Sequence, residues 1–182
     1  MEIKETGFEG LLVIKPEVHS DSRGYFFESF NLKEFEKHGI FFSPVQDNES
    51  KSSRGVIRGL HYQLKPHHQA KLVRVVSGKI YDVALDIRKG SPTFGKWFGI
   101  ELDSETRSQL FIPGGFAHGY SVMSEIAIIQ YKVDNYYDIV LERGINIKDP
   151  ELNIDWRTGE APHIISDKDV RNPGFRDAEY NF

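Results

Sequence analysis

The feature that most constrains the fold is a series of short segments that alternate between two faces and end at turn residues. Residues 71–76 and 81–88 both alternate with a period of two, which is the side-chain period of a β-strand. Ser77-Gly78-Lys79 separates the two segments as a tight turn, and Gly90-Ser91-Pro92 ends the second. Apolar residues occur on both faces, so we expect a sheet that is rolled over a core or a pocket.

Further segments of the same kind predict an all-β domain. Strands are expected at residues 97–102, 109–112 and 127–133, and short strands with Gly and Pro turns are typical of a sandwich or barrel. A short helix is predicted after Asn31, which can cap it, and before Gly39, which can close it. The 182 residues contain no repeat or linker and fit one domain over residues 1–182.

Composition excludes several classes of function. The chain has no cysteine, which removes disulfides, thiolate nucleophiles and cysteine-based zinc sites. Its net charge is −4, which argues against nucleic acid as a partner. No apolar run approaches the length of a membrane span, and residues 1–10 lack the apolar core of a signal peptide. We therefore expect a cytoplasmic protein that binds neither membrane nor nucleic acid.

One stretch of this acidic chain is exclusively basic. Residues 50–81 contain no Asp or Glu, and their cations are Lys51, Arg54, Arg58, Lys65, Lys71, Arg74 and Lys79. Such a block favours a site for a small anion such as a phosphate ester, although a solvated basic surface is the simpler interpretation of charge alone. Arg58, His61 and Lys71 lie within this block, and an imidazole is suited to general-base catalysis near neutral pH.

A second segment resembles a cupin motif. Pro113-Gly114-Gly115-Phe116-Ala117-His118 has the Pro-x-Gly-x-x-His spacing of the second cupin motif, with glycines suited to a tight bend. In many cupins this histidine binds a metal together with a His-x-His and a Glu of the first motif. Residues 50–81 contain neither a His-x-His nor a Glu. We therefore predict no metal and no cofactor, with His118 as a possible hydrogen-bonded wall residue.

Two further segments offer proton carriers and orienting groups. Tyr131 and Tyr137 lie near the end of the last long strand; a buried tyrosine can transfer a proton, and a second one can stack on a nucleobase. Asp169 follows Ile165-Ser166-Asp167-Lys168 in a turn or helix start and could orient His61. Asp82, on a predicted strand, is the alternative orienting carboxylate.

Taken in order, these segments resemble the dTDP-4-dehydrorhamnose 3,5-epimerase family over about residues 7–169. The resemblance also rests on residues 21–28, 46–50, 58–63 and 90–95. One departure is Arg157 after Trp156, where the family usually has proline. The resemblance implies a cupin-type jelly-roll β-barrel with short flanking helices. It also implies inversion of carbons 3 and 5 of dTDP-4-dehydro-6-deoxy-D-glucose, giving dTDP-4-dehydro-L-rhamnose through an enolate.

The resemblance also implies residue roles. His61 is the expected proton acceptor with Asp169 orienting it, Tyr131 is the proton donor, and Lys71 stabilises the enolate. The diphosphate and sugar are expected to contact Arg58, Arg23 and Lys168. The remaining binding residues are Tyr137, which is expected to stack on thymine, and the pocket-lining Gln46, Asp47, Asn48, Glu28, His118 and Glu142.

A homodimer is implied as well, with Arg23 and Glu28 serving the neighbouring subunit's site. Three alternative functions remain open on the sequence. A mono-epimerase acting on carbon 3 or 5 only would keep the same residues. A cupin that merely binds a nucleotide sugar would not need both His61 and Tyr131. A metal-dependent cupin isomerase or dioxygenase would need a metal site.

Overall fold

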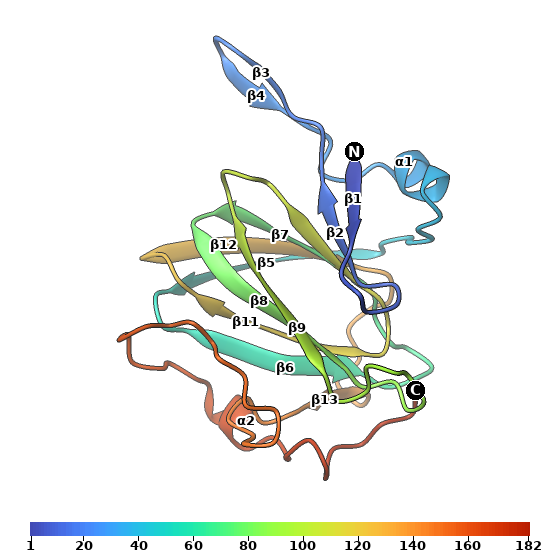
Figure 1. Ribbon diagram of the computed structural model, residues 1–182, viewed down its shortest axis with the longest axis vertical. Helices are drawn as coiled ribbons and strands as arrows, with labels where there is room; N and C mark the ends of the chain where they lie inside the picture. Colours follow the sequence, from blue (N-terminus) through green and yellow to red (C-terminus); the bar gives the residue numbers. More distant parts are fainter.

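The computed structural model describes residues 1–182, which form two facing antiparallel sheets (Figure 1). The six-stranded sheet has the order β1 (Glu2–Glu5), β2 (Leu12–Lys15), β10 (Gln109–Ile112), β7 (Lys71–Ser77), β12 (Ile126–Val133) and β5 (Gln46–Ser53). The five-stranded sheet has the order β13 (Glu142–Gly144), β6 (Ile57–Gln63), β11 (Phe116–Val122), β8 (Lys79–Asp86) and β9 (Trp97–Asp103). This arrangement confirms the predicted jelly roll, and the strands expected from alternation are all present.

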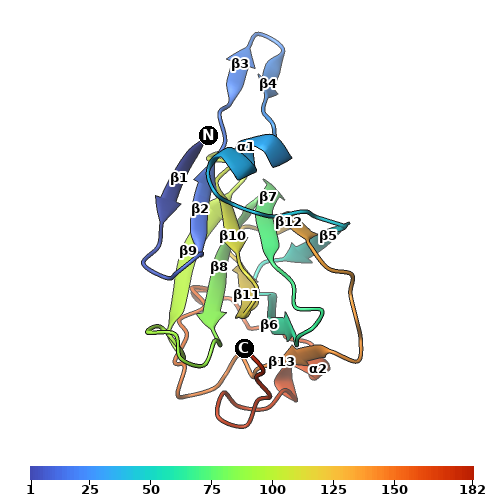
Figure 2. The same ribbon diagram turned by 90° about the vertical axis from the view of Figure 1, so that its right-hand side faces the viewer.

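A hairpin and two short helices flank the sheets. Strands β3 (His19–Asp21) and β4 (Gly24–Phe26) form a separate two-stranded hairpin, which projects away from both sheets (Figure 2). Helix α1 (Leu32–Lys37) begins where predicted, because the Asn31 side chain accepts hydrogen bonds from the next turn's backbone. Helix α2 (Asp167–Val170) is a single turn capped by Ser166. No helix of the chain is long and apolar enough to cross a bilayer.

Strand β8 shows why both faces of the alternating segments are apolar. Ile80 and Ala84 point between the two sheets and join the core that fills the barrel. Val83 and Leu85 point to the opposite face, where they pack against residues of the C-terminal segment. The sheet is therefore covered on both sides.

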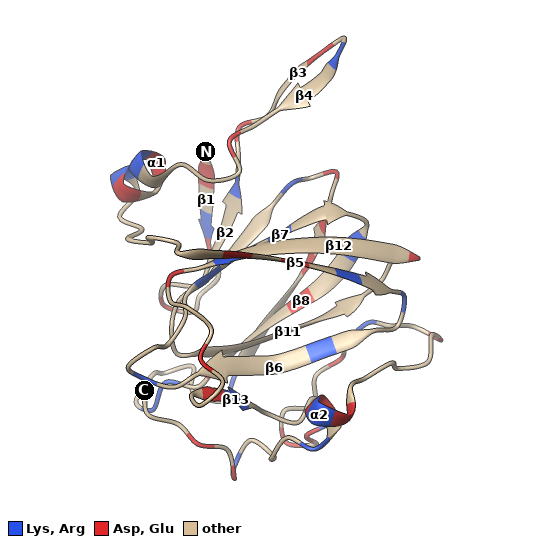
Figure 3. Cartoon of the chain, turned by 180° about the vertical axis from the view of Figure 1, so that it is seen from behind, with Lys and Arg blue, Asp and Glu red and all other residues tan.

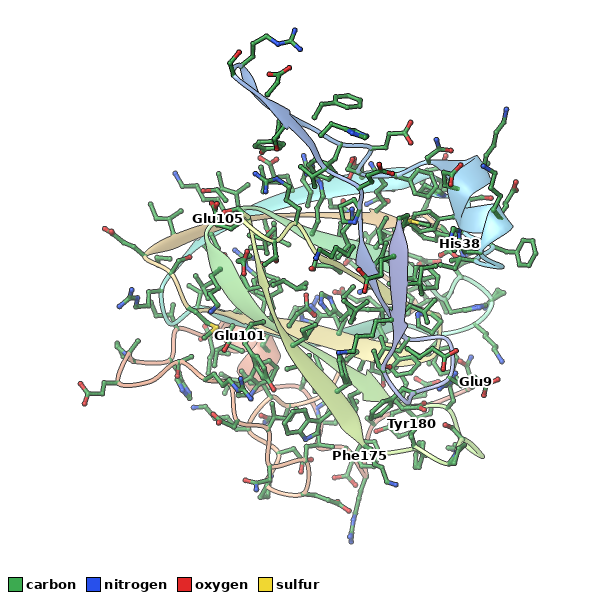
Figure 4. The ribbon with its side chains drawn as sticks, turned by 45° about the horizontal axis from the view of Figure 1, so that its top comes forward. Glu9, His38, Glu101, Glu105, Phe175 and Tyr180 are labelled. Atoms are coloured by element: carbon green, nitrogen blue, oxygen red, sulfur yellow. The ribbon has the colours of Figure 1, made fainter.

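The C-terminal segment, residues 145–182, supplies this outer cover. Trp156 is 5% exposed and donates its indole N–H to the carbonyl of Ile147. Phe175 and Tyr180 lie side by side near one end of β9 (Figure 4), with ring centroids 5.6 Å apart. This cover seals the outer face of the five-stranded sheet, so the face that remains for a site is the one that meets the six-stranded sheet.

Candidate active site

A cavity of about 600 Å³ lies between the two sheets. It adjoins a second compartment of about 330 Å³, and His61, Lys71 and Tyr131 line both. His61 belongs to β6 of the five-stranded sheet, whereas Lys71 and Tyr131 belong to β7 and β12 of the six-stranded sheet. The three predicted catalytic groups therefore enter one cavity from opposite walls.

A bulge in β6 brings Arg58 and His61 to the same side. Residues three apart on a regular strand point to opposite faces. Here His118 and Tyr120 of β11, two residues apart, pair with His61 and Arg58, so β6 carries one extra residue. Gly59 makes this possible: it has φ +124, and a Cβ there would lie 2.5 Å from the Cα of Gly119.

His61 is held by a buried carboxylate. Its Nε2 lies 2.7 Å from Oδ1 of Asp169, which is 3% exposed. Burial alone would raise the pKa of Asp169. The hydrogen bonds that its carboxylate accepts from His61 and from the amide of Gly59 outweigh this effect of burial, so the pKa of Asp169 is lowered. An ionised carboxylate can only accept, so Nε2 of His61 carries the hydrogen. Nδ1 is then left with a free lone pair, as a general base requires.

His118 forms a second pair of the same kind. Its Nε2 lies 2.7 Å from Oδ1 of the fully buried Asp82. His118 is the direct cross-strand neighbour of His61, so the two imidazoles lie side by side on one wall. Asp169, and not the alternative Asp82, is thus the carboxylate that contacts His61. No group of three or more His, Asp or Glu side chains is arranged to hold a metal ion.

Lys71 is a buried cation on the opposite wall. It is 8% exposed, and burial lowers its pKa to about 8, although Asp82 and Glu142 oppose the shift. Lys71 pairs with Val133, and Tyr131 with Val73, so the two functional side chains are diagonal neighbours on the six-stranded wall. A poorly solvated ammonium in this position is suited to stabilising a negative charge that develops on a ligand oxygen.

Tyr131 faces the same space from β12. Burial raises the pKa of its phenol, which keeps the hydroxyl protonated at neutral pH. The neighbouring Tyr120 is tied to Ser50 through a hydrogen bond of 2.9 Å between their hydroxyls. Tyr131 can therefore act as a proton donor toward a ligand whose other face meets His61.

The second compartment is organised around Glu142. Its Oε2 accepts hydrogen bonds from the hydroxyl of Tyr137 at 2.7 Å and from Nζ of Lys168 at 2.6 Å. The Glu142 hydrogen bond is the main cause that raises the pKa of Tyr137 to about 12. Gln46 accepts from the Tyr137 amide and donates to Asn48, so these five predicted residues form one connected network.

Three predicted binding residues lie outside these compartments of their own chain. Asp47 points to the other face of β5 from Gln46 and Asn48, and it pairs with Lys132 at 2.5 Å. The expectation that Asp47 lines the pocket fails within this chain, because alternation along β5 turns its side chain outward. Arg23 lies at the hairpin tip with its side chain 88% exposed, and Glu28 contacts Asn31 beside α1. The prediction that Arg23 and Glu28 serve a partner's site stays a prediction.

The basic block is also less concentrated than its sequence indicates. Of its seven cations, only Arg58 and Lys71 line the two compartments, and Lys168 of α2 adds a third. Arg74 points to the outer face of β7 and donates to Gln130, because β7 has no bulge between it and Lys71. Figure 3 shows Lys and Arg positions spread over both sheets, both helices and the hairpin tip.

Sequence reasoning missed several residues that line the cavity. Ser50, Tyr120 and Ser166 do so without having been singled out. Ser166 carried a usable signal, since a serine three residues before Asp169 is an N-cap pattern, and the Asp169 amide indeed donates to its hydroxyl. Ser50 and Tyr120 had only their position beside recognised motifs.

Comparison with known proteins decides the family. Residues 5–177 match the sequence profile of the family described as dTDP-4-dehydrorhamnose 3,5-epimerase. A Shigella flexneri protein of that name is 50% identical over 181 residues, covering 99% of each chain. The chain belongs to the dTDP-4-dehydrorhamnose 3,5-epimerase family.

Solved structures of the family have the same fold. The crystal structure of the dTDP-4-dehydrorhamnose 3,5-epimerase from Elizabethkingia anophelis is similar with a TM-score of 0.93 and 47% identity, covering 97% of each chain. The dTDP-6-deoxy-D-glucose-3,5-epimerase of Legionella pneumophila, solved in complex with dTDP-4-keto-L-rhamnose, has a TM-score of 0.91 and 46% identity. That likeness covers 95% of this chain and 92% of the Legionella chain.

Proposed function

We propose that this family member inverts carbons 3 and 5 of dTDP-4-dehydro-6-deoxy-D-glucose and produces dTDP-4-dehydro-L-rhamnose. One observation carries the proposal. His61, paired with Asp169, and Tyr131 lie on opposite walls of a single cavity, with Lys71 beside Tyr131. Inversion at carbon needs two proton carriers on opposite faces of the sugar, and this arrangement provides them.

The chemistry follows from the ketone at carbon 4, which acidifies the hydrogens on carbons 3 and 5. His61 takes a proton from carbon as the C–H electron pair moves into the enolate and the negative charge moves to the carbon-4 oxygen. Lys71 stabilises that oxygen electrostatically. The enolate then re-forms the ketone while Tyr131 donates its proton to the opposite face. Proton exchange with solvent restores both groups before the second carbon reacts.

Binding is assigned to the groups around the reacting centre. Arg58 and Lys168 are the cations placed to neutralise the diphosphate. Tyr137, 52% exposed at the mouth of the second compartment, offers a ring on which the thymine base can stack. Glu142 forms hydrogen bonds with both Tyr137 and Lys168, so it connects the residue proposed to bind the thymine base with one proposed to bind the diphosphate.

We also propose a homodimer, in which the β3–β4 hairpin reaches the partner's cavity. The hairpin projects from its own subunit, and it exposes Tyr25 and Phe26 at 55% and 66%. An exposed apolar hairpin is typical of an interaction surface. In such a dimer Arg23 and Glu28, which lie far from the cavity of their own chain, would complete the partner's site.

The test is incubation with dTDP-4-dehydro-6-deoxy-D-glucose in heavy water, read by NMR. The proposal predicts deuterium at both carbon 3 and carbon 5, together with the L-rhamno product. Deuterium and inversion at one carbon only would identify a mono-epimerase instead. Tight binding without any exchange would identify a non-catalytic nucleotide-sugar-binding protein and would refute the proposal.

A further inference from the structure

The side chain of Gln63 ties together two loops beside the candidate active site. It lies at the end of β6, two residues after His61, and is 3% exposed. Its Nε2 donates to the carbonyl of His67 at 2.6 Å and to that of Tyr136 at 3.2 Å. Its Oε1 accepts from the amide of Asp138 at 2.8 Å. All hydrogen-bonding groups of this side chain thus hold backbone of residues 64–70 and 134–141.

The two backbone groups held in the second loop flank Tyr137 directly. Residues 136 and 138 are fixed by Gln63, and the Tyr137 amide donates to Oε1 of Gln46 on the other side. The loop has little apolar packing of its own, since Tyr136 and Ile139 are 70% and 76% exposed. Its conformation therefore depends on hydrogen bonds more than on burial.

Further contacts support the same junction without reaching Tyr137. Asn135 donates to the carbonyl of His68 at 2.7 Å, and Gln69 donates to the carbonyl of Asn135 at 2.8 Å. His67 contacts the carboxylate of Asp138 at 3.1 Å, where both groups are accessible to solvent. Among the polar side chains of this junction, that of Gln63 is buried whereas those of Gln69 and Asn135 are partly exposed, so its hydrogen bonds are the ones that water replaces least easily.

We propose that Gln63 is a positioning residue that presets the ring of Tyr137 and so determines affinity for the nucleotide base. This inference rests on the proposed stacking role of Tyr137. When the ring is already in position, binding does not have to include the entropic cost of ordering the loop. Gln63 therefore affects the affinity for the nucleotide and leaves the chemistry at the sugar unchanged. The presence of Gln63 at the end of the 58–63 motif is then explained by its hydrogen bonds to the backbone around Tyr137.

The experiment replaces Gln63 with methionine, which has a similar length and no hydrogen-bonding group. The probe is dTDP, titrated by calorimetry, and turnover is measured at saturating substrate. Base stacking is worth about 5- to 150-fold in affinity. We expect Gln63→Met to weaken dTDP binding about tenfold, and by no more than Tyr137→Ala does, with turnover within about twofold of wild type. Gln130→Met, on the outer face of β12, is the matched control and should leave both unchanged.

A double-mutant cycle separates positioning from a general structural effect. If Gln63 acts through Tyr137, Gln63→Met should add less than about twofold to the loss already caused by Tyr137→Ala. An additive loss, an unchanged affinity in Gln63→Met, or a fall in saturated turnover with unchanged affinity would each overturn the inference. If Tyr137→Ala itself leaves dTDP affinity unchanged, the proposed stacking role fails instead, which is a different result.

A second variant, Gln63→Glu, tests the inference in case Gln63→Met fails to fold. Gln63→Glu keeps an acceptor for the Asp138 amide but, when ionised, loses both donors. We expect weaker dTDP binding with the Asp138 amide still protected from hydrogen exchange. Wild-type affinity in this variant would contradict the inference.

Discussion

Replacing Lys71 with methionine should make the protein more stable and less active. Lys71 is almost fully buried, and its pKa falls from 10.5 to about 8. A folded-state pKa below the unfolded value means that the protonated lysine opposes folding. Methionine has a similar length and no charge, so it removes this cost together with the cation that we assign to the enolate oxygen.

The magnitude follows from the pKa shift. A displacement from 10.5 to about 8 corresponds to about 3 kcal/mol of destabilisation when the lysine is protonated in both states. This cost is fully present below pH 8, shrinks as pH rises from about 8 to 10.5, and is under about 1 kcal/mol at pH 10. Loss of one oxyanion-stabilising group should lower turnover about 10²–10³-fold.

Urea unfolding at pH 7 and pH 10, together with steady-state kinetics, tests both effects. Lys71→Met should gain up to about 3 kcal/mol at pH 7 and less than about 1 kcal/mol at pH 10. Lys51→Met, at an exposed position of β5, is the control and should change neither quantity. Wild-type activity should decline as pH rises through about 8. A variant that is less stable at pH 7, or that keeps full turnover, would refute the assignment of Lys71 as a buried catalytic cation.

Three further predictions concern the metal, the dimer and the bulge. Activity should survive EDTA, because no group of three or more His, Asp or Glu side chains is arranged to hold a metal ion; a loss of activity that one divalent ion restores would contradict this. Light scattering should give about twice the 20.9 kDa chain mass. Mixing inactive Arg23→Ala and His61→Ala subunits should restore activity, because a mixed dimer has one site with both residues intact. A fully active monomer would argue against the shared site. Gly59→Ala should destabilise the fold by about 2 kcal/mol or more in thermal unfolding, because Gly59 has φ +124 and a Cβ there would lie 2.5 Å from backbone. Wild-type stability in this variant would contradict the steric argument.

The sequence predicted the five strands β7, β8, β9, β10 and β12 from their apolar alternation, and the other eight strands, β5 among them, were not predicted. Strand β5 has the sequence Gln-Asp-Asn-Glu-Ser-Lys-Ser-Ser, so no hydrophobic period marks it. The reason is physical: Gln46 and Asn48 face a polar compartment, and the opposite face meets solvent. Had the strand been recognised, its period of two would have turned Asp47 away from the compartment that Gln46 and Asn48 line.

The sequence also could not predict which distant segments pair with one another. Whether Asp82 or Asp169 contacts His61 depends on strand register and on where residues 165–169 return, and neither leaves a local signal. The bulge that turns Arg58 toward His61 likewise depends on β11 approaching Gly59. The residue types at the site were predictable because the chemistry requires them, whereas their partners required the fold.

The central claim is that His61 removes a proton and Tyr131 returns one from the opposite wall. Deuterium incorporation from heavy water in Tyr131→Phe and His61→Ala tests it most directly. Tyr131→Phe keeps its base, so it should wash deuterium into carbon 3 or carbon 5 while forming little inverted product. His61→Ala should do neither, since a general base contributes about 10²–10⁴-fold or more when nothing replaces it. Near-normal inversion by Tyr131→Phe, or continued exchange by His61→Ala, would contradict the account.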